Sequence, residues 1–374
     1  MKKVVMFGSN VHEIPPTKGA AVQTWIDETS KKLLKYQTHI ISISHPFYPN
    51  KEFKDGVFFH RIHLSKVYKR IFQKILGWDI YSYNKRVFNI IKKINPDIIH
   101  IHNYYGSKEI IRWIKEFNKD TKIILHMHNL SKSFDKLDFP KIDMFIGCSQ
   151  FIVESFKDKI NANRYEVVYN GVDNEKYQNA IKYEKILRKE KSIFYFGRVS
   201  EEKGVDKIIE IAKLLKNEEY KIYCIGEIST DGKRRKYYDN LLNIIKKNNL
   251  DNITFFDYIS AQKIHLAYQM ADMIIVPSKI EEAFGMIVIE AMASGVPTIC
   301  VYKGGMKEYL EDNKNSMIIF DYQNFAKESV NKIKLLENKE IYNKIKYGGF
   351  ETAQKFDWLN IAQTLEGLYD ELCY

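Results

Sequence analysis

The stretch from residue 276 to residue 298 constrains the fold of this chain more than any other, because it contains a complete strand, loop, helix, turn and strand. A short β-branched run ends at Pro277, which predicts a buried strand followed by a loop. Apolar residues then recur at helical spacing over residues 284–293, and Gly295 predicts the end of that helix before the next strand. Strands and helices that alternate in this way are typical of an α/β domain with a parallel sheet.

Two glutamates and the start of this helix are candidate binding groups. Glu282 lies in the loop, and Glu290 lies two turns inside the helix. The first backbone N–H groups, those of Phe284, Gly285 and Met286, are available to an anionic or hydroxylated ligand. Glu290 lies on an otherwise apolar face, so its carboxylate requires a hydrogen-bond donor such as a vicinal diol. The alternative is a capped structural helix with a buried ion pair at Glu290, and the spacing alone does not separate the two.

Length and composition limit the classes of protein to which this chain can belong. A chain of 374 residues is long enough for two domains, and 45% hydrophobic with 28% charged residues is typical of a globular protein. No apolar run approaches the roughly 20 residues of a membrane-spanning helix, and the first apolar run is too short for a signal peptide. The four cysteines lie far apart and predict no metal or redox pair, which favours the reducing cytoplasm.

The net charge of +11 is typical of a protein with an anionic partner, and the alternative is a composition biased toward lysine and isoleucine. Because no nucleic-acid-binding module is recognisable, we expect no nucleic acid, and we expect phosphorylated ligands or an anionic membrane surface instead. Residues 66–78 combine basic residues with apolar and aromatic ones at helical spacing, which is typical of a helix in a membrane interface. The alternative is that this segment packs on its own domain. Residues 231–238 are predicted to form a solvated basic loop.

The first half of the chain begins with a predicted buried strand over residues 3–8, a loop with two consecutive prolines, and a helix from Gly19. A glycine at the start of a helix that follows a strand is typical of a phosphate-binding turn. The dinucleotide-binding fingerprint of three spaced glycines directly after the strand is absent, which disfavours a dehydrogenase. Residues 56–64 alternate in polarity and predict a strand at an exposed or edge position.

Two further predicted strands, residues 98–102 and 122–127, each carry histidines. The second leads into His126, His128 and Asn129, and ligands of open α/β sheets bind outside the carboxyl ends of the strands. These three residues are therefore candidates for a ligand pocket. The alternative is that they are ordinary satisfied polar residues, as we expect for the two histidines of the first strand.

The second half begins with a predicted strand over residues 193–197, which leads into Arg198, Lys203 and a helix from Val205. Both cations and the positive end of the helix converge on one point, which suits a diphosphate. The alternative is a pair of solvated surface cations. The charged segment over residues 170–190 precedes this strand and is predicted to contain the hinge between two domains.

One set of residues in the second half matches a known signature: Glu282, Ala283, Phe284, Gly285, Glu290, Ala291, Met292, Gly295 and Pro297. The set closely resembles the donor-site signature of retaining glycosyltransferases of family 4, and matching pieces extend from Gly8 to Trp358. The resemblance implies the GT-B fold, in which two Rossmann-like doubly wound parallel-sheet domains face each other across a cleft. The expected domains are an acceptor-binding domain (1–175), a donor-binding domain (176–354) and a final helix (355–374) that packs back on the first.

The resemblance also implies a set of donor-binding residues: Gly19, Ala20, Arg198, Lys203, Tyr258, Ile259, Glu282, Ala283, Phe284, Gly285, Met286 and Glu290. Arg198 and Lys203 would hold the leaving diphosphate, and Glu282 with the backbone after it would bind the sugar hydroxyls. Glu290 would bind the ribose diol. The backbone at Tyr258 and Ile259 would contact the base.

Two parts of the first half are also assigned by the resemblance. His128, with Asn129 beside it, best matches the strand-end histidine that approaches the transferred sugar in family 4, and His126 is the second candidate. The catalytic candidates are then Arg198, Lys203, Glu282 and His128. Family 4 enzymes usually carry two adjacent glycines where this chain has Gly19 and Ala20, a departure that leaves one conformationally free position.

The activity that the resemblance implies is a metal-independent, retaining transfer of the hexosyltransferase type, with a nucleotide-sugar as co-substrate and no other cofactor. A UDP-sugar is the favoured donor, and the expected acceptor is a lipid-linked or cell-envelope glycan or a teichoic-acid-type polymer. We expect a cytoplasmic enzyme, peripheral at the inner face of the membrane if residues 66–78 bind it. The alternatives are a nucleotide-sugar 2-epimerase of the same architecture, and an inactive glycosyltransferase-like partner or coat protein.

Overall fold

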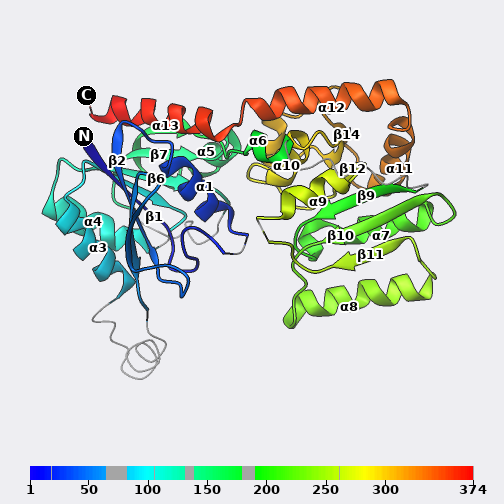
Figure 1. Cartoon of the computed structure of the whole chain (residues 1–374), viewed down its shortest axis with the longest axis horizontal. Coiled ribbons are helices and arrows are strands. Elements are labelled where there is room, and N and C mark those ends of the chain that lie inside the picture. Colours follow the sequence, from blue (N-terminus) through cyan, green and yellow to red (C-terminus); the bar gives the residue numbers. More distant parts are fainter. Residues whose placement is uncertain are drawn as a thin grey trace. The chain divides into compact units, whose positions relative to one another are not determined.

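The computed structural model in Figure 1 describes residues 1–17, 19–64, 82–104, 106–130, 139–178, 190–260 and 262–373. The chain divides into two compact units. Unit 1 comprises Met1–Gly171 with Trp358–Tyr374, and unit 2 comprises Val172–Asp357. Both divisions lie within a few residues of the boundaries expected from the sequence. The amphipathic segment expected over residues 66–78 lies outside the described residues.

Unit 1 is built on an eight-stranded sheet with the order β3-β4-β2-β1-β5-β6-β7-β8. Its neighbouring strands are parallel, except that β3 pairs antiparallel with β4. The strands are β1 (Lys2–Phe7), β2 (Tyr36–Ile43), β3 (Lys51–Lys54), β4 (Val57–Ile62), β5 (Ile98–His102), β6 (Lys122–Met127), β7 (Ile142–Gly147) and β8 (Ala162–Val167). The central strands are nearly continuous apolar runs, as parallel strands covered on both faces require.

The edge position predicted for residues 56–64 is wrong, because β3 covers that edge. β4 lies between β3 and β2, and β3 is the outer strand. Asp55 and Gly56 connect β3 to β4, and both have positive φ, 51° and 78°. Positive φ at both central residues is the requirement of a tight two-residue hairpin turn, and an Asp-Gly pair satisfies it at little cost.

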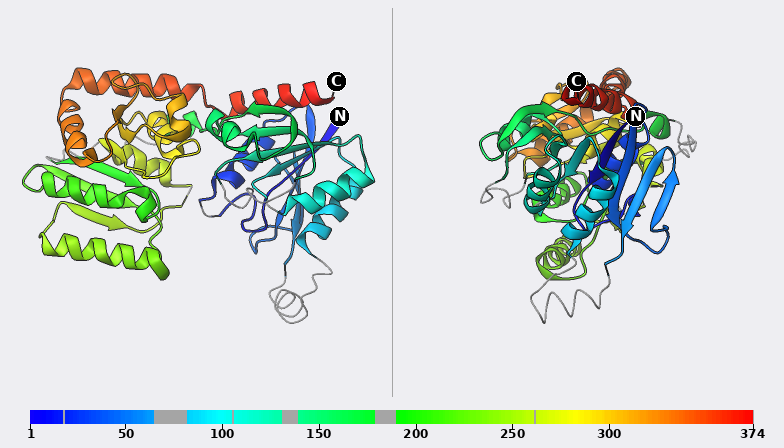
Figure 2. Two further views of the ribbon diagram at one scale, coloured as in Figure 1. Left: turned by 180° about the vertical axis from the view of Figure 1, so that it is seen from behind. Right: turned by 90° about the vertical axis from the view of Figure 1, so that its left-hand side faces the viewer.

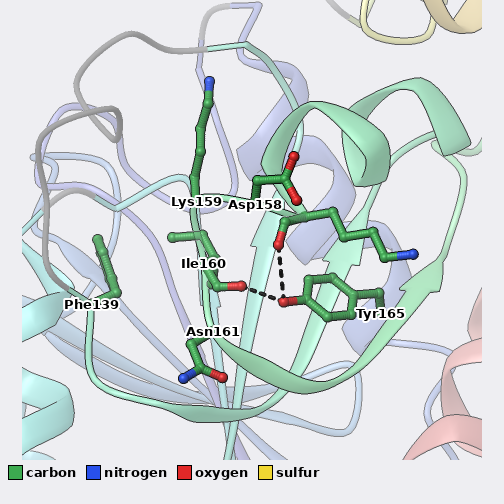
Figure 3. A pocket seen from close by; sticks show the side chains of 7 residues that line it. Phe139, Asp158, Lys159, Ile160, Asn161 and Tyr165 are labelled. Atoms are coloured by element: carbon green, nitrogen blue, oxygen red, sulfur yellow. Dashed lines mark hydrogen bonds between the residues drawn. The ribbon is translucent and has the colours of Figure 1, made fainter.

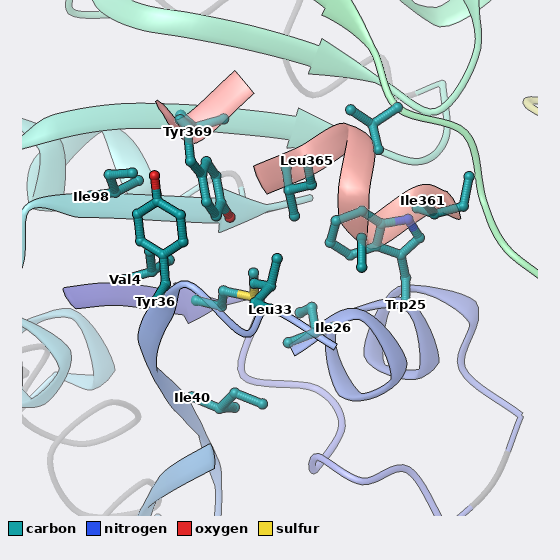
Figure 4. Packing of buried hydrophobic residues seen from close by; sticks show 14 of the residues in the cluster. Val4, Trp25, Ile26, Leu33, Tyr36, Ile40, Ile98, Ile361, Leu365 and Tyr369 are labelled. Carbon is teal, nitrogen blue, oxygen red and sulfur yellow. The ribbon is translucent and has the colours of Figure 1, made fainter. Parts of the chain in front are cut away.

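Within the described part of unit 1 the helices are α1 (Ala21–Ser30), α3 (Tyr83–Ile94), α4 (Ser107–Phe117), α5 (Gln150–Phe156) and α13 (Trp358–Cys373). α3 and α4 pack side by side (Figure 2). α13 is the last helix of the chain, yet it packs against α1 near the start. The buried cluster there includes Trp25, Leu33, Leu365 and Tyr369 (Figure 4). A Cβ at Gly171 would lie 2.3 Å from the Trp358 ring, so the turn that ends the first segment of unit 1 requires glycine.

Unit 2 is built on a six-stranded parallel sheet with the order β11-β10-β9-β12-β13-β14. Its strands are β9 (Lys191–Phe196), β10 (Tyr220–Ile225), β11 (Ile253–Phe256), β12 (Met273–Val276), β13 (Thr298–Val301) and β14 (Met317–Ile319). Its helices are α6 (Asn174–Gln178), η3 (Glu201–Lys203), α7 (Val205–Leu214), α8 (Gly232–Lys247), α9 (Ile264–Met270), α10 (Met286–Ala293), η4 (Gly304–Glu308), α11 (Phe325–Leu335) and α12 (Lys339–Gln354).

The basic loop predicted over residues 231–238 is instead the first half of α8. This helix lies alongside the edge strand β11 (Figures 1 and 2). Tyr237 anchors it through its hydroxyl, which donates to the Asp206 carboxylate and accepts from the Asp206 N–H, both at 2.9 Å. Tyr238 packs edge-on against Phe255 with ring centroids 5.4 Å apart. These contacts favour a helix in a segment whose four consecutive basic residues oppose the helix dipole.

Each sheet reverses its strand order at one place. In unit 1 the reversal lies between β1 and β5, and in unit 2 it lies between β9 and β12. Connections leave the two central strands in opposite directions at such a place, which opens a crevice outside their carboxyl ends. The loops after β9 and β12 contain Arg198, Lys203 and Glu282, so the predicted diphosphate and sugar residues share one edge of the sheet of unit 2.

Candidate functional site

The structure joins Lys203 and Glu282 although they are 79 residues apart in the chain. The Lys203 Nζ donates to Glu282 Oε1 at 2.6 Å, and each side chain is 17% exposed. Ser278 Oγ donates to the same carboxylate oxygen at 2.5 Å. Lys203 comes from the short helix η3 after β9, and Glu282 comes from the loop after β12. A lysine has three N–H donors, so this one can keep Glu282 and still bind an anion.

A glycine allows the two loops to meet. Gly204 has φ of +71°, and a Cβ there would lie 1.9 Å from the Pro277 carbonyl oxygen. Only glycine combines that backbone conformation with such a close approach. The turn from η3 into α7 therefore lies directly against the loop that carries Glu282.

The backbone of Glu282 is also held in place, by contacts with the short helix η4. The Gly305 N–H donates to the Glu282 carbonyl at 2.8 Å, and a Cβ at Gly304 would lie 2.1 Å from the same oxygen. The Gly304 N–H donates to the carboxylate of Glu281, the residue before. Glu282 is thus fixed at both its carboxylate and its backbone. These contacts orient the carboxylate before a ligand binds.

Arg198 lies at the same end of the sheet and is more open to solvent. The Tyr195 hydroxyl donates to the Arg198 carbonyl at 2.8 Å, which fixes the backbone as it leaves β9. The guanidinium lies 3.7 Å from the Glu202 carboxylate, and the side chain is 46% exposed. An exposed arginine beside a weak partner is available to a bidentate anion such as a phosphate.

The start of α10 carries the predicted backbone donors. Gly285 is the N-cap, with φ of +88°, and a Cβ there would lie 2.5 Å from Met306. The Tyr309 hydroxyl donates to the Phe284 carbonyl at 2.8 Å. Phe284 itself is 1% exposed, so only its backbone is placed to meet a ligand. The Val288 N–H donates back to the Gly285 carbonyl at 3.0 Å, so the N–H groups of Met286 and Ile287 are the ones that suit an anion or hydroxyl.

Glu290 is a partly buried carboxylate on α10 that two tyrosines hold. The Tyr268 hydroxyl, from α9, donates to Glu290 Oε2 at 2.6 Å, and the Tyr177 hydroxyl, from α6, also donates to this carboxylate. Burial raises the pKa of Glu290, and these hydrogen bonds act in the opposite direction. The buried ion pair considered from the sequence is therefore not what satisfies this group. Tyr177 and Tyr268 were not identified from the sequence as partners of Glu290, because they lie on other helices that are distant in the sequence.

Tyr258 and Ile259 follow the edge strand β11, at the same end of the sheet as the loops after β9 and β12. Tyr258 is 41% exposed, and its N–H donates to the Asp257 carboxylate at 2.7 Å. Ile259 is partly buried. Their expected contact with a base stays a prediction.

In unit 1 the helix predicted from Gly19 begins two residues later, at Ala21. Ala20 is its N-cap, and the Ala20 carbonyl accepts from the Thr24 N–H at 2.9 Å. The φ of Ala20 is −148°, an extended conformation that any residue adopts. Alanine is therefore compatible with this backbone at the position where relatives usually carry a second glycine.

The two candidate histidines lie at the carboxyl end of β6 in unit 1, and they differ in their contacts. The His128 Nδ1 lies 3.1 Å from Asn170 Oδ1, and its Nε2 lies 3.1 Å from the Nδ1 of His102. Burial lowers the pKa of His128 to about 4. His126 is fully buried, whereas Asn129 is exposed. Both ring nitrogens of His128 already have a hydrogen-bond partner, so a sugar that binds this ring would have to replace Asn170 or His102. The contact with the sugar stays a prediction.

A separate shallow hollow lies on unit 1 between the end of α5 and β8 (Figure 3). It is lined by Phe139, Lys157, Asp158, Lys159, Ile160, Asn161 and Tyr165. None of the predicted site residues lines it, and its polar, open walls lack the apolar enclosure of a small-molecule site.

The fold and the site together define a class. Two Rossmann-like domains with parallel sheets form the GT-B architecture of glycosyltransferases, and residues 177–352 match the family described as glycosyl transferases group 1. Residues 22–176 match glycosyltransferase family 4. The chain belongs to the group 1 glycosyl transferases, and it is an enzyme that transfers a glycosyl group. Among the described residues, no helix is long and apolar enough to cross a bilayer.

Three similar proteins illustrate the family and the fold. The chain is 30% identical over 381 residues to the lipopolysaccharide 1,2-N-acetylglucosaminetransferase of Salmonella typhimurium, covering 98% of this chain and 97% of that one. The sucrose-phosphate synthase of Thermosynechococcus elongatus has a similar structure, with a TM-score of 0.78, 16% identity and 99% of both chains covered. Anabaena HepE, in complex with UDP-glucose, gives a TM-score of 0.77 at 17% identity over 98% of this chain and 99% of that one.

Proposed function

We propose that this glycosyltransferase transfers a hexose from a nucleotide-sugar, with a UDP-sugar favoured, to a cell-envelope or lipid-linked glycan, without a metal and with retention. The observation that carries the proposal is the Lys203–Glu282 pair beside two helix starts at one end of the sheet. A lysine, an exposed arginine and the positive ends of two helices attract a diphosphate. The complex of HepE with UDP-glucose supports the donor class, and the lipopolysaccharide-modifying relative supports the acceptor class.

Arg198 and Lys203 would stabilise the leaving diphosphate. As the glycosidic bond to the phosphate breaks, negative charge grows on the diphosphate oxygens, and fixed cations near them lower the barrier. Lys203 is held by Glu282 before the donor binds, so little reorganisation is needed. Two cations supplied by side chains do the work that a divalent ion does in other transferases, and this is the basis for expecting metal independence.

Glu282 and the start of α10 would bind the sugar. The carboxylate accepts hydrogen bonds from sugar hydroxyls, while the backbone of Ala283, Phe284, Gly285 and Met286 presents N–H donors. Glu290 would accept both hydroxyls of the ribose diol while Tyr268 continues to orient it. The backbone at Tyr258 and Ile259 would contact the base.

The residues of unit 1 would serve the sugar and the acceptor. His128 would contact the transferred sugar, with Asn129 beside it and His126 as the second candidate, and the Gly19–Ala20 turn would contact the donor. Retention follows if the acceptor hydroxyl attacks the face that the diphosphate leaves, with a donor phosphate oxygen accepting the acceptor proton. No side-chain nucleophile takes part. We place the reaction in the cytoplasm, with residues 66–78 as the proposed contact with an anionic membrane.

A donor screen followed by a transfer assay tests the proposal. Thermal shift against UDP-, GDP- and ADP-sugars identifies the donor, because ligands that bind the folded state raise its stability. Transfer to a lipid-linked glycan is then assayed with and without a chelator, and the anomeric configuration of the product is determined by NMR. Inversion contradicts retention. Activity that a chelator abolishes while the protein stays folded, and that a divalent ion restores, contradicts metal independence. A sugar isomer formed from donor alone would identify an epimerase.

A further inference from the structure

Four histidines of unit 1 form a buried cluster, of which the proposed transfer uses only His128, with His126 as the second candidate. His100 and His102 alternate along β5, so both point to the same face of the sheet, and His102 pairs in register with His126 on β6. His128 follows two residues after His126. Trp25 from α1 covers all four rings, with centroid distances of 4.7–5.8 Å.

Several ring nitrogens of this cluster have no hydrogen-bond partner among the described residues. They are Nε2 of His100, Nε2 of His102 and both nitrogens of His126. All three side chains are fully buried. Buried polar atoms in folded proteins are nearly always paired, so four unpaired nitrogens in one place can accommodate a shared polar partner such as an ion.

Neighbouring groups assign the tautomers of His128 and His102, and a hydroxyl accommodates either tautomer of His100. Asn170 Oδ1 can only accept, so the His128 Nδ1 carries the proton that it shares with this oxygen. The His128 Nε2 then accepts from the Nδ1 of His102, which leaves the Nε2 of His102 as a bare lone pair. The Nδ1 of His100 lies 2.6 Å from the Tyr369 hydroxyl. A proton on that Nδ1, donated to the hydroxyl oxygen, likewise makes the His100 Nε2 a lone pair.

We propose that His100, His102 and His126 bind one divalent transition-metal ion, with Zn²⁺ as the representative. One nitrogen from each ring lies within 4.8 Å of the other two. Three neutral imidazoles with no carboxylate select Zn²⁺, Co²⁺, Ni²⁺ or Cu²⁺ over Mg²⁺ or Ca²⁺. Zinc–nitrogen bonds of about 2.0–2.1 Å place tetrahedral ligand atoms about 3.4 Å apart. The ligand atoms therefore have to approach one another by up to about 1.4 Å, and the stacked rings have to turn, before all three bind one ion.

Burial, together with repulsion among the rings, holds the pKa of His100, His102 and His126 well below the usual value. The backbone of Val168 acts in the opposite direction on His126, although neither ring nitrogen reaches hydrogen-bond geometry with a described atom.

The hydrogen bonds made by the other nitrogens of these rings show which elements the ion would stabilise. Metal-bound histidines usually donate their other ring N–H to an oriented partner. Tyr369 on α13 is that partner for His100, and His128 is that partner for His102. The ion would therefore join β5, β6 and the C-terminal helix. Its role is structural, and it is separate from the diphosphate chemistry assigned to Arg198 and Lys203.

Metal titration tests the site. The purified protein is stripped with a chelator, dialysed and titrated with Zn²⁺ against a chromophoric competitor at pH 7.5, and unfolding is followed with and without Zn²⁺. We expect one equivalent of tight binding and a raised melting temperature. Co²⁺ in place of Zn²⁺ should give the visible absorption bands of a tetrahedral nitrogen site. A wild-type protein that binds neither ion stoichiometrically overturns the proposal.

Variants assign the binding to these rings. His126→Asn and His102→Asn should each weaken Zn²⁺ binding at least 100-fold. His39→Asn is the matched control, because His39 is also buried, on β2 of the same sheet, and it should retain full binding. Circular dichroism checks that each variant folds. If both cluster variants fold and keep the tight equivalent, the proposal is wrong, and if neither folds, the Co²⁺ spectrum of the wild-type protein decides.

Discussion

At the scale of single residues, the Lys203–Glu282 pair is the most informative feature of the site. The two residues are 79 positions apart in the sequence, yet they form an ion pair with 2.6 Å between the Lys203 Nζ and the Glu282 Oε1. Each of the two side chains is 17% exposed, and the pair lies beside the starts of α7 and α10. This placement is the one that the proposed diphosphate site requires.

The first prediction concerns the charge of Lys203. Lys203→Met keeps the length of the side chain and removes the ammonium, so the diphosphate loses a fixed cation in the transition state. Transition-state charges of this kind contribute roughly 3–4 kcal/mol, so we expect kcat to fall at least 100-fold in a transfer assay. Lys207→Met is the matched control, since Lys207 lies one turn further on and pairs with Glu210 at 2.9 Å. Equal losses in both variants would contradict the assignment.

The second prediction concerns Glu290. Glu290→Gln keeps a carbonyl oxygen for Tyr268 and Tyr177 but removes the negative charge and one acceptor, so the helix should fold normally. A hydrogen bond to a charged group contributes about 1.5–3 kcal/mol, so UDP affinity should fall about tenfold or more. Isothermal titration with UDP measures it. Unchanged affinity for UDP in a folded variant would rule out the ribose contact.

The sequence predicted the charged residues of the site but not the groups that hold them. Lys203, Glu282 and Glu290 belong to local patterns that can be read within a dozen residues. Ser278 lies near Glu282 in the chain, yet serines in loops carry no specific signal. Tyr268 reaches Glu290 from a different helix, and such partners follow from the packing of the sheet rather than from spacing.

At the scale of elements, the start of α10 depends on a glycine. Gly285 has φ of +88°, and an added Cβ would lie 2.5 Å from Met306 and 2.8 Å from the Tyr309 hydroxyl. Gly285→Ala should therefore lower the free energy of unfolding by about 1–3 kcal/mol, from strain at positive φ and from the collision. Urea unfolding measures this loss, and donor affinity should fall with it.

Gly367 supplies the matched control for this prediction. It lies in the interior of α13, where a Cβ meets no described atom within 4 Å. Gly367→Ala should raise the free energy of unfolding by about 0.5–1 kcal/mol, because alanine loses less backbone freedom in a helix. If Gly285→Ala were as stable as the wild-type protein, the backbone of the α10 start would not be as described.

Buried histidines predict that acid destabilises unit 1. Burial lowers the pKa of His39 and of His128 to about 4, against 6.5 as the ordinary value. Between those pH values the unfolded chain binds more protons than the folded one. The contribution of these histidines to the free energy of unfolding is therefore fully present above pH 6.5. It declines as pH falls to about 4, at up to about 1.4 kcal/mol per pH unit for each histidine.

Urea unfolding at several pH values, in the presence of a chelator, measures this decline. His39→Leu should make the decline less steep, by up to about 1.4 kcal/mol per pH unit, because the leucine has no proton to gain while His128 still does. The groups near His39 are His60, at 3.1 Å, and Lys3. His12→Asn changes an exposed histidine and should leave the profile as it is. A profile that is flat between pH 7 and pH 4.5 in the wild-type protein would contradict the burial of these rings.

The two element predictions that proved wrong share a cause. The edge strand β3 and the helix α8 are short or charged, so their apolar patterns are weak. β3 is specified by the Asp-Gly turn after it, and α8 is anchored by Tyr237 and Tyr238. The buried parallel strands were predicted correctly because continuous β-branched runs leave few alternatives. Turn chemistry and single tyrosine anchors carry information that periodicity does not contain.

At the scale of the whole molecule, the chain folds as two units with separate cores. Unit 1 is completed by α13, the last helix in the sequence, whose Leu365 and Tyr369 join the cluster around Trp25. Family resemblance implied this arrangement, whereas the sequence pattern alone indicated only an amphipathic helix. Contacts between the two ends of a chain follow from topology, and no local signal contains them.

The two cores predict two separable responses to mutation. Leu365→Ala removes a fully buried side chain from unit 1, and Ile211→Ala removes one of similar size from α7 of unit 2. Each truncation should cost about 2–5 kcal/mol. Hydrogen exchange followed by mass spectrometry should then show faster exchange in β1 and β5 for the first variant, and in β9 and β10 for the second. Unfolding of both sheets together in either variant would mean that the chain is one cooperative unit, and the separate cores would not act as independent folding domains.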